Sequence, residues 1–138
     1  MANQKFKKEL NSLGAKAKEA KEFLLNSSVD TRNDALKFAC EEIHKNRSDL
    51  FKENEKDLEE AKKLDLQNSF IDRLELNEKR VDSMIDGLNK VINLNDPIGE
   101  LEEMNPSPSG FKVSKMRVPL GTIGIIYESR PNVTADDS

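Results

Sequence analysis

One cysteine and one histidine carry the most reactive side chains of this sequence, and they lie four positions apart. Cys40 and His44 can share one face of a helix, which is a geometry in which a histidine activates a thiol as a nucleophile. The apolar residues nearby favour another interpretation, because they recur at the spacing of the buried face of an amphipathic helix. These residues are Leu36, Ala39, Cys40 and Ile43. We therefore predict that Cys40 packs in a core, and that a chain with one cysteine and one histidine has no disulfide and no zinc or other metal site.

A second group of reactive side chains follows a short apolar run near the carboxyl end. The run Thr122–Tyr127 is rich in β-branched residues and contains a glycine, which is typical of a buried strand that another backbone approaches closely. In the next segment, the Arg130 guanidinium can bind a carboxylate or phosphate through two hydrogen bonds, or hold the turn through an ion pair with Glu128 or another acid. Open α/β sheets bind ligands in turns of this kind. A plain connecting loop explains the composition equally well.

The composition excludes several classes of function. The chain has 138 residues, of which 35% are charged and 36% apolar, and its net charge is -4. No basic face of the kind that binds nucleic acid is visible. The amino-terminal lysines alternate with glutamates and precede no apolar segment, and no apolar run approaches the ~20 residues of a membrane span. We expect a soluble, cytoplasmic protein that binds neither nucleic acid nor membranes.

The first two thirds of the sequence have the periodicity of helices. Apolar residues predict a first helix that ends near residues 26–28, and a second that starts at a Ser28 or Asp30 cap and ends about His44. The segment Lys52–Lys63 is almost wholly charged and predicts a solvated helix. Asn77 can cap a further helix with a continuous apolar stripe, which consists of Val81, Met84, Ile85, Leu88, Val91 and Ile92. Core packing is the preferred explanation of this stripe over a partner-binding face.

The helical pattern stops at Asn95-Asp96-Pro97, because proline lacks the backbone N–H and disfavours helix in the residue before it. Two extended segments follow, at Glu100–Met104 and Phe111–Val118, and the residues between them, 105–110, have the prolines and the glycine of a turn. We predict a β-hairpin with one wet face.

The stretch from Arg117 to Thr134 reads RVPLGTIGIIYESRPNVT and, over eighteen residues in register, closely resembles a segment of the gamma-glutamyl phosphate reductases, a family of the aldehyde dehydrogenase superfamily. Upstream residues also match this family in order and spacing. They are Asp72-Arg73-Leu74, Arg80, Met84, Gly87-Leu88 and 96–100. The resemblance covers the whole chain and is strongest from Asp72 onward.

The resemblance implies NADPH-dependent reduction of gamma-glutamyl phosphate to glutamate 5-semialdehyde, with release of phosphate, in proline biosynthesis. In this family a cysteine thiolate attacks the acyl phosphate, and hydride from the nicotinamide converts the resulting thioester to the aldehyde. Each step passes through an oxyanion, at which hydrogen-bond donors must already point. The family's nucleophilic cysteine lies beyond the matched region, and Cys40 lies in the wrong region to replace it. We expect the 138-residue chain to be inactive alone.

The resemblance also implies roles for four residues of the turn. Asn132 would be catalytic, because its amide can donate to the oxyanion and it resembles an asparagine that follows the first cofactor-domain strand in aldehyde dehydrogenases. The alternative is that Asn132 only shapes the turn through a bond to the backbone. Arg130 would bind the substrate, which carries both a carboxylate and a phosphate. Ser129 and Pro131 would line the nicotinamide side of the NADP site.

The expected fold is α/β and resembles the amino-terminal fragment of an aldehyde dehydrogenase, with helices followed by a β-hairpin and the first strand of the dinucleotide-binding domain. Residues 1–95 would form a helical segment, 96–118 an oligomerisation hairpin, and 119–138 the truncated start of the cofactor-binding domain. The implied partners are gamma-glutamyl phosphate, further copies of the chain in a homo-oligomer, and glutamate 5-kinase. The alternative function is a non-catalytic helical interaction or oligomerisation module derived from that enzyme. The two readings differ in whether the coding sequence continues after Ser138.

Overall fold

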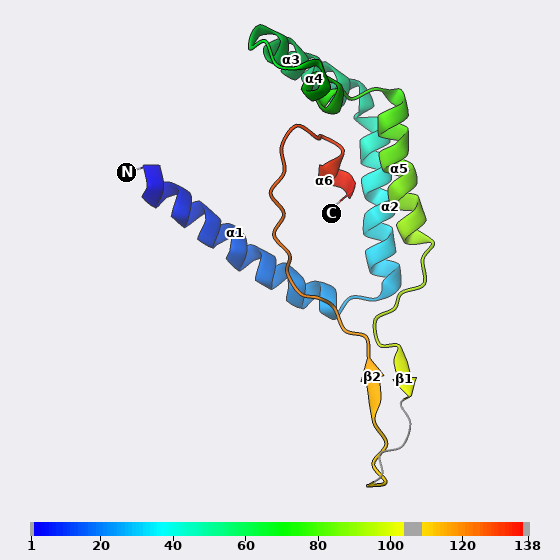
Figure 1. Cartoon of the computed structure of the whole chain (residues 1–138). Coiled ribbons are helices and arrows are strands. Elements are labelled where there is room, and N and C mark those ends of the chain that lie inside the picture. Colours follow the sequence, from blue (N-terminus) through cyan, green and yellow to red (C-terminus); the bar gives the residue numbers. More distant parts are fainter. Residues whose placement is uncertain (1, 104–108, 137–138) are drawn as a thin grey trace. The chain divides into compact units, whose positions relative to one another are not determined.

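The computed structural model of the chain describes residues 2–103 and 109–136 (Figure 1). Its elements, in chain order, are α1 (Ala2–Leu25), α2 (Val29–Lys45), α3 (Arg47–Lys63), α4 (Asn68–Leu74), α5 (Glu78–Ile92), β1 (Leu101–Glu103), β2 (Ser114–Met116) and α6 (Val133–Asp136). The predicted order of helices followed by a hairpin is therefore confirmed. No helix of these residues is both long enough and apolar enough to cross a membrane.

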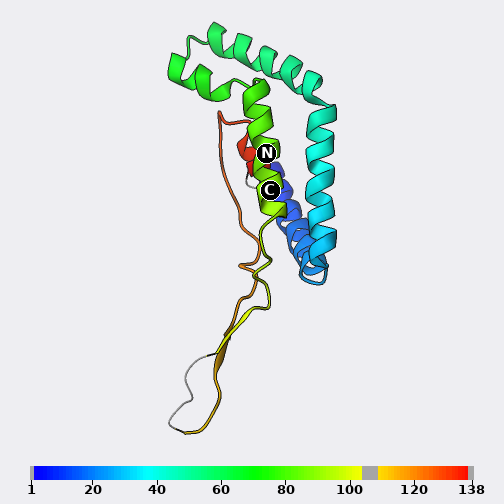
Figure 2. The ribbon, with the colours of Figure 1, turned by 90° about the vertical axis from the view of Figure 1, so that its right-hand side faces the viewer.

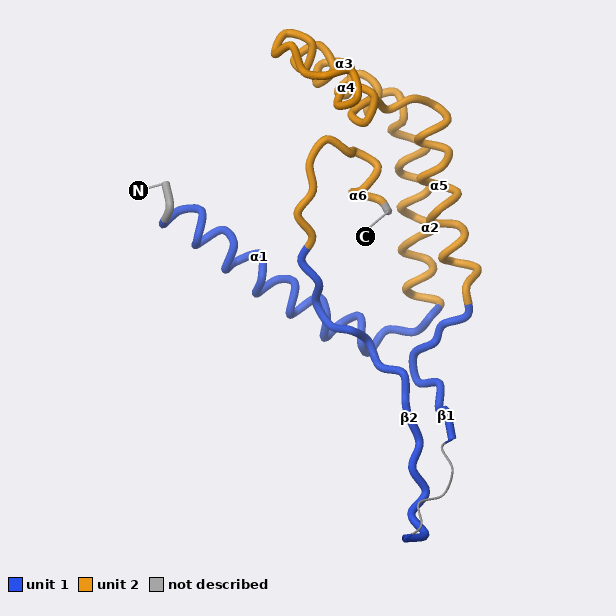
Figure 3. The backbone as a smooth tube through the Cα atoms, in the orientation of Figure 1, with its two compact units in different colours: residues 1–29, 95–124 blue, residues 30–94, 125–138 orange. Residues whose placement is uncertain are grey.

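The chain divides into two compact units (Figure 3). One unit contains residues 1–29 and 95–124, and the other contains residues 30–94 and 125–138. The predicted functional division into residues 1–95, 96–118 and 119–138 stays a prediction.

In the second unit, α2 and α5 lie against each other in antiparallel orientation. Asn33 Nδ2 near the start of α2 donates to the Ile92 carbonyl at the end of α5, 3.5 Å away, and the Cys40 thiol makes a weak contact of 3.9 Å with the Ile85 carbonyl. The α3 and α4 helices contact each other and run side by side in both views (Figures 1 and 2). Arg47 Nη2 at the start of α3 pairs with Asp82 of α5 at 2.6 Å. These contacts connect the α3–α4 pair to the α2–α5 pair.

The core of this unit is small and is built largely on α5. Its buried apolar side chains are Cys40, Ala61, Val81, Met84 and Leu88. The predicted start of α5 is confirmed, since the Asn77 side chain accepts a 3.0 Å hydrogen bond from the Arg80 N–H and so satisfies a donor that the helix leaves unpaired. The predicted stripe is buried in its first three turns, whereas Val91 at its end is 51% exposed. Core packing explains the stripe, as predicted.

In the first unit, α1 ends where the sequence predicted. Asn26 Nδ2 donates to the Glu22 carbonyl at 2.8 Å, and the Ser27 hydroxyl donates to the Leu24 carbonyl at 2.8 Å, so these side chains satisfy carbonyls that the last turn leaves free. The helix keeps large apolar side chains on its surface, among them Phe6, Leu10 and Leu13.

The hairpin of the first unit is shorter than predicted. β1 and β2 pair in antiparallel register, with Leu101 opposite Met116. Backbone hydrogen bonds continue the ladder, from the Gly99 N–H to the Arg117 carbonyl at 2.9 Å and from the Arg117 N–H to the Glu100 carbonyl at 3.0 Å. Both strands are exposed on both faces rather than on one. Residues 104–108, which hold most of the predicted turn, lie outside the described residues.

The predicted buried strand at Thr122–Tyr127 is wrong for this chain. The segment is irregular and exposed, and Ile126 is fully accessible to solvent. A strand is stabilised by hydrogen bonds to a neighbouring strand, and the described part of the chain provides none for these residues. Two helices also differ from the prediction, because α3 begins at Arg47 rather than near Lys52, and the short α4 was not predicted.

Candidate functional site

Residues 127–132 form a compact turn that leads into α6. The hydroxyls of Tyr127 and Thr134 share a hydrogen bond of 2.6 Å, which closes the turn. Inside it, the Val133 N–H donates to the Arg130 carbonyl at 3.1 Å. Ser129 has φ of 60°, a left-handed conformation that few residues other than glycine adopt. The turn is therefore a shaped structure rather than a plain extended connection.

Asn132 occupies the position just before α6 and lies against α5. Its backbone carbonyl accepts from the Ala135 N–H at 3.0 Å, as expected at the cap of a helix. Together with Arg80, Ser83 and Met84 of α5 it lines a hollow of about 190 Å³. The cap position suits the alternative that Asn132 only shapes the turn. The hollow suits the catalytic role, because the Asn132 side chain can be oriented there. The predicted catalytic role of Asn132 stays a prediction.

Arg130 lies on the exposed side of the turn. Among the described residues, no ion pair joins the Arg130 guanidinium to Glu128, the acid that the sequence suggested as a partner. Its predicted role in substrate binding is untested.

Ser129 lies in a different hollow from Asn132. This second hollow, of about 300 Å³, also lies within the second unit. Its apolar lining consists of Ala61, Leu64, Leu66, Phe70 and Leu74, and its polar lining of Asp57, Glu60, Glu128 and Ser129. Pro131 is half-buried and lines neither hollow. Neither of these two hollows gathers the four predicted residues.

The hollow that Ser129 lines does not fit the phosphates of a dinucleotide such as NADP. The cofactor carries negatively charged phosphates, whereas the hollow that Ser129 lines has three carboxylic acids and no lysine or arginine. A third hollow, of about 580 Å³, lies at the hairpin and is lined by residues 100–102 and 115–117. It mixes acidic and basic side chains and has none of the predicted site residues. The roles of Ser129 and Pro131 in binding the cofactor stay predictions.

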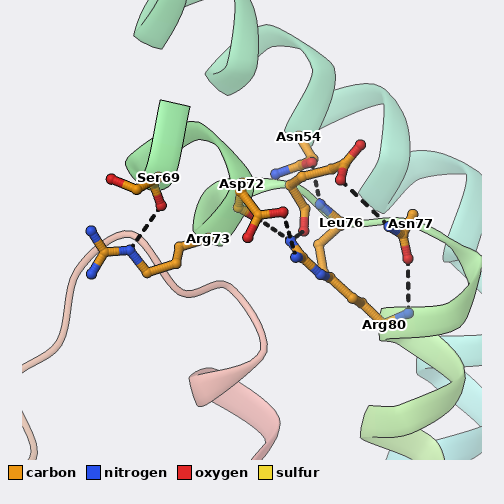
Figure 4. Close-up of polar contacts among 8 residues, drawn as sticks. Asn54, Ser69, Asp72, Arg73, Leu76, Asn77 and Arg80 are labelled. Carbon is orange, nitrogen blue, oxygen red and sulfur yellow. Dashed lines mark hydrogen bonds and ion pairs between the residues drawn. The ribbon is translucent and has the colours of Figure 1, made fainter. Parts of the chain in front are cut away.

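Arg80 is the residue near Asn132 that the sequence left without a role. Its guanidinium donates to the Glu75 carbonyl at 2.7 Å and to the Asp72 carboxylate at 3.1 Å, and it also contacts the Asp72 carbonyl (Figure 4). The end of α4 leaves its last carbonyls unpaired, so a cation here satisfies them and complements the helix dipole. Arg80 was visible in the sequence as part of the family match, but its contacts depend on residues brought together by the fold.

Asn54 of α3 also holds the corner between α4 and α5, which consists of the end of α4 and residues 75–77. It is 4% exposed, its amide donates to the Leu74 carbonyl at 2.8 Å, and its Oδ1 accepts from the Leu76 N–H at 2.7 Å (Figure 4). One buried amide therefore satisfies both the carbonyl that ends α4 and the N–H that begins the link to α5. The sequence carries no signal for this role, because Asn54 lies in the strongly charged segment Lys52–Lys63, whose composition predicts a solvated helix.

Cys40 shows the properties of a packing residue. The side chain is buried, and burial raises the pKa of its thiol, which keeps the thiol neutral and weakly nucleophilic. His44 lies on the exposed side of α2. The prediction that Cys40 packs in the core is confirmed. Among the residues with described positions, no group of three or more acidic, histidine or cysteine side chains is placed to hold a metal ion.

Curated proteins with similar sequences bear out the family resemblance. The chain is 48% identical over 128 residues to the gamma-glutamyl phosphate reductase of Clostridium botulinum strain Alaska E43, and the match includes 93% of this chain and 31% of that protein. The chain thus spans about a third of the length of the curated relatives it matches. No protein-family model matches it.

Solved structures agree with the sequence match. The crystal structure of gamma-glutamyl phosphate reductase from Thermotoga maritima is 39% identical, with a TM-score of 0.85 over 94% of this chain and 31% of that one. The corresponding structure from Saccharomyces cerevisiae is 28% identical, with a TM-score of 0.81 over 88% of this chain and 31% of that one. In sequence and in fold, the chain corresponds to the amino-terminal region of the gamma-glutamyl phosphate reductases.

Proposed function

We propose that this chain serves as the amino-terminal part of an oxidoreductase that uses NADPH to reduce gamma-glutamyl phosphate to glutamate 5-semialdehyde, in proline biosynthesis. The observation that carries the proposal is the 48% identity to a reductase across 93% of the chain. The turn with Arg130, Pro131 and Asn132 lies within the segment of strongest resemblance. The alternative, a helical interaction module without catalysis, rests on the many exposed apolar side chains of α1 and of the segment after the hairpin.

The proposed chemistry requires groups that the described residues do not supply. A thiolate must displace phosphate from the acyl carbon, and the only cysteine, Cys40, is buried in the helical unit. NADPH would supply the hydride, yet the hollow that Ser129 lines offers no cation for its phosphates. We therefore place the nucleophile and the groups that bind the cofactor phosphates in the two thirds of the relatives' length that this chain does not span. The contribution of this chain would be donors and shape at the turn.

Asn132 is the residue to which we assign that contribution. An amide aimed at the developing oxyanion stabilises the transition state more than the ground state, because negative charge forms only as the nucleophile adds. Its cap position before α6 and its contact with the α5 face limit the directions in which the side chain can point. Arg130, with an exposed guanidinium, would bind the carboxylate or phosphate of the substrate.

A hybrid protein tests the proposal. The full chain is joined to the portion of the Clostridium botulinum relative that lies beyond the match, and formation of NADPH from NADP, phosphate and glutamate 5-semialdehyde is measured. We expect activity that requires all three compounds. The Asn132→Ala hybrid should lose roughly 10² to 10³ in kcat with little change in KM. A hybrid that folds but has no activity would favour the interaction module.

The same hybrid tests the predicted assembly. We propose that the hairpin contributes to a homo-oligomer, because β1 and β2 form an isolated pair with exposed edges, and such pairs are marginally stable in water unless another element adds to them. Binding of glutamate 5-kinase is a further proposal that rests on the resemblance alone. Sedimentation of the hybrid with and without the kinase measures both. Monomeric hybrid at micromolar concentration would contradict the hairpin's role.

A further inference from the structure

We infer that Arg80 is a positioning residue that fixes the direction of the Asn132 amide. The inference rests on the proposed function, because it assigns Arg80 a role in the reaction only through Asn132. Its structural basis is the shared hollow of the second unit, in which side chains from one face of α5 lie against the residue that caps α6.

Arg80, Ser83 and Met84 form one continuous wall of this hollow. They are three and four positions apart on α5 and so project from the same face of the helix. Met84 is buried in the core, and the Ser83 hydroxyl donates to the Lys79 carbonyl of its own helix at 2.9 Å. Those two side chains are therefore held by α5 itself. Arg80 is the long, polar part of the wall, and its position has to be set by other contacts.

Arg80 is held both at its backbone and at its guanidinium. Its backbone N–H is bound by the Asn77 side chain, and its guanidinium is bound by oxygens of Asp72 and Glu75 at the end of α4 (Figure 4). A planar guanidinium with several fixed acceptors loses the rotational freedom that an exposed arginine keeps. Arg80 is consequently a rigid part of the lining of the hollow that Asn132 also lines.

Such a surface can restrict the orientation of the Asn132 amide. A donor contributes to an oxyanion only if its direction is set within about 10–20° before the reaction. Asn132 is half-buried, and the helix that it caps, α6, has only four residues, which is too short to be rigid by itself. The wall on α5 adds a constraint from its side of the hollow, and the contacts of Arg80 with the end of α4 make that wall rigid.

A double-mutant comparison in the hybrid reductase separates this role from a general effect on stability. Arg80→Ala should lower kcat about 10- to 100-fold, with KM for NADP nearly unchanged, and Arg80→Lys, which keeps the stem and the charge, should recover part of the loss. In the Asn132→Ala background the same Arg80→Ala change should cost less than about 3-fold, because the amide it positions is gone. Arg73→Ala is the matched control, since Arg73 Nε also donates to a carbonyl of α4, that of Ser69, at 3.0 Å but lines no described hollow. It should leave kcat within about 2-fold of the parent.

Multiplicative losses in the double variant would overturn the inference and leave the proposed function standing. An inactive parent hybrid would overturn the proposed function instead. The inference is then decided in the hybrid, folded but inactive, by nuclear magnetic resonance, with the side-chain amide signals of Asn132 identified by their loss in Asn132→Ala. Those signals should move in Arg80→Ala and Asp72→Asn and stay in place in Arg73→Ala. Unmoved signals in the Arg80 variant would refute the positioning role.

Discussion

Replacing Asn54 by alanine should destabilise the helical unit more than any surface change to it. The substitution removes the 2.8 Å bond to the Leu74 carbonyl and the 2.7 Å bond to the Leu76 N–H, at a site that is 4% exposed. A buried backbone group without a partner costs about 1–3 kcal/mol. Leu74 and Leu76 are half-buried, so water can reach them partly and the lower part of that range, about 1–1.5 kcal/mol, applies to each of the two groups. For both groups together we expect a loss of about 2–3 kcal/mol in the free energy of unfolding.

Urea unfolding followed by circular dichroism measures this loss, at a protein concentration below the micromolar range in which we expect the chain to self-associate. Asn89→Ala is the matched control, because Asn89 is an exposed asparagine within α5 and alanine is the better helix former. It should stay within about 0.5 kcal/mol of the parent. A similarly small effect of Asn54→Ala would refute the claim that this amide secures the corner between α4 and α5.

Asn54→Asp gives the same reasoning a pH dependence. A carboxylate accepts from the Leu76 N–H but repels the Leu74 carbonyl, whereas the protonated acid can donate to that carbonyl. Burial and the carbonyl both raise the folded-state pKa of the new group above its ordinary value of about 3.9. The recovered stability is therefore fully present below the unfolded-state pKa and is lost as pH rises through the folded-state pKa. A variant whose deficit relative to the parent does not shrink on acidification would contradict the donor role of the Asn54 amide.

Two further predictions concern the core and the exposed apolar segment. Cys40→Ser in the hybrid should leave turnover within about 10-fold of the parent, and native Cys40 should react with iodoacetamide at pH 8 at least about 10-fold more slowly than in urea, because burial raises the pKa of its thiol. Rapid alkylation of the folded chain would show that the thiol is accessible. The 138-residue chain alone should self-associate at micromolar concentration, since Leu120, Ile123 and Ile126 are exposed without a covering element in the described structure. Sedimentation that shows a compact monomer would contradict this.

The helices were predictable because their signals are local. The cap at Asn77, the proline after Asp96 and the apolar spacing around Cys40 each act within a few residues, and the structure places α5, the end of the helical region and the burial of Cys40 accordingly. The family resemblance was also carried by a contiguous stretch of sequence and needed no fold to be seen.

The strand predicted at Thr122–Tyr127 failed for the opposite reason. β-branched residues favour a strand, but a strand exists only where a second strand completes its hydrogen bonds, and that partner is not a property of the segment itself. Ser129 and Asn132 raise the same problem at the site. They are three residues apart in the sequence, yet they line separate hollows, because different helices lie against them.

By itself the sequence determined three of the longer helices, the hairpin, the packing of Cys40 and the likeness to the reductases, since these depend on periodicity, capping and contiguous motifs. Only the tertiary structure decided that Asn54 and Arg80 hold the end of α4 and that Arg80 and Asn132 line one hollow. The physical reason is that a hydrogen bond at 2.8 Å depends on where two distant backbones meet. The spacing of residues along the chain does not determine which distant segments come into contact.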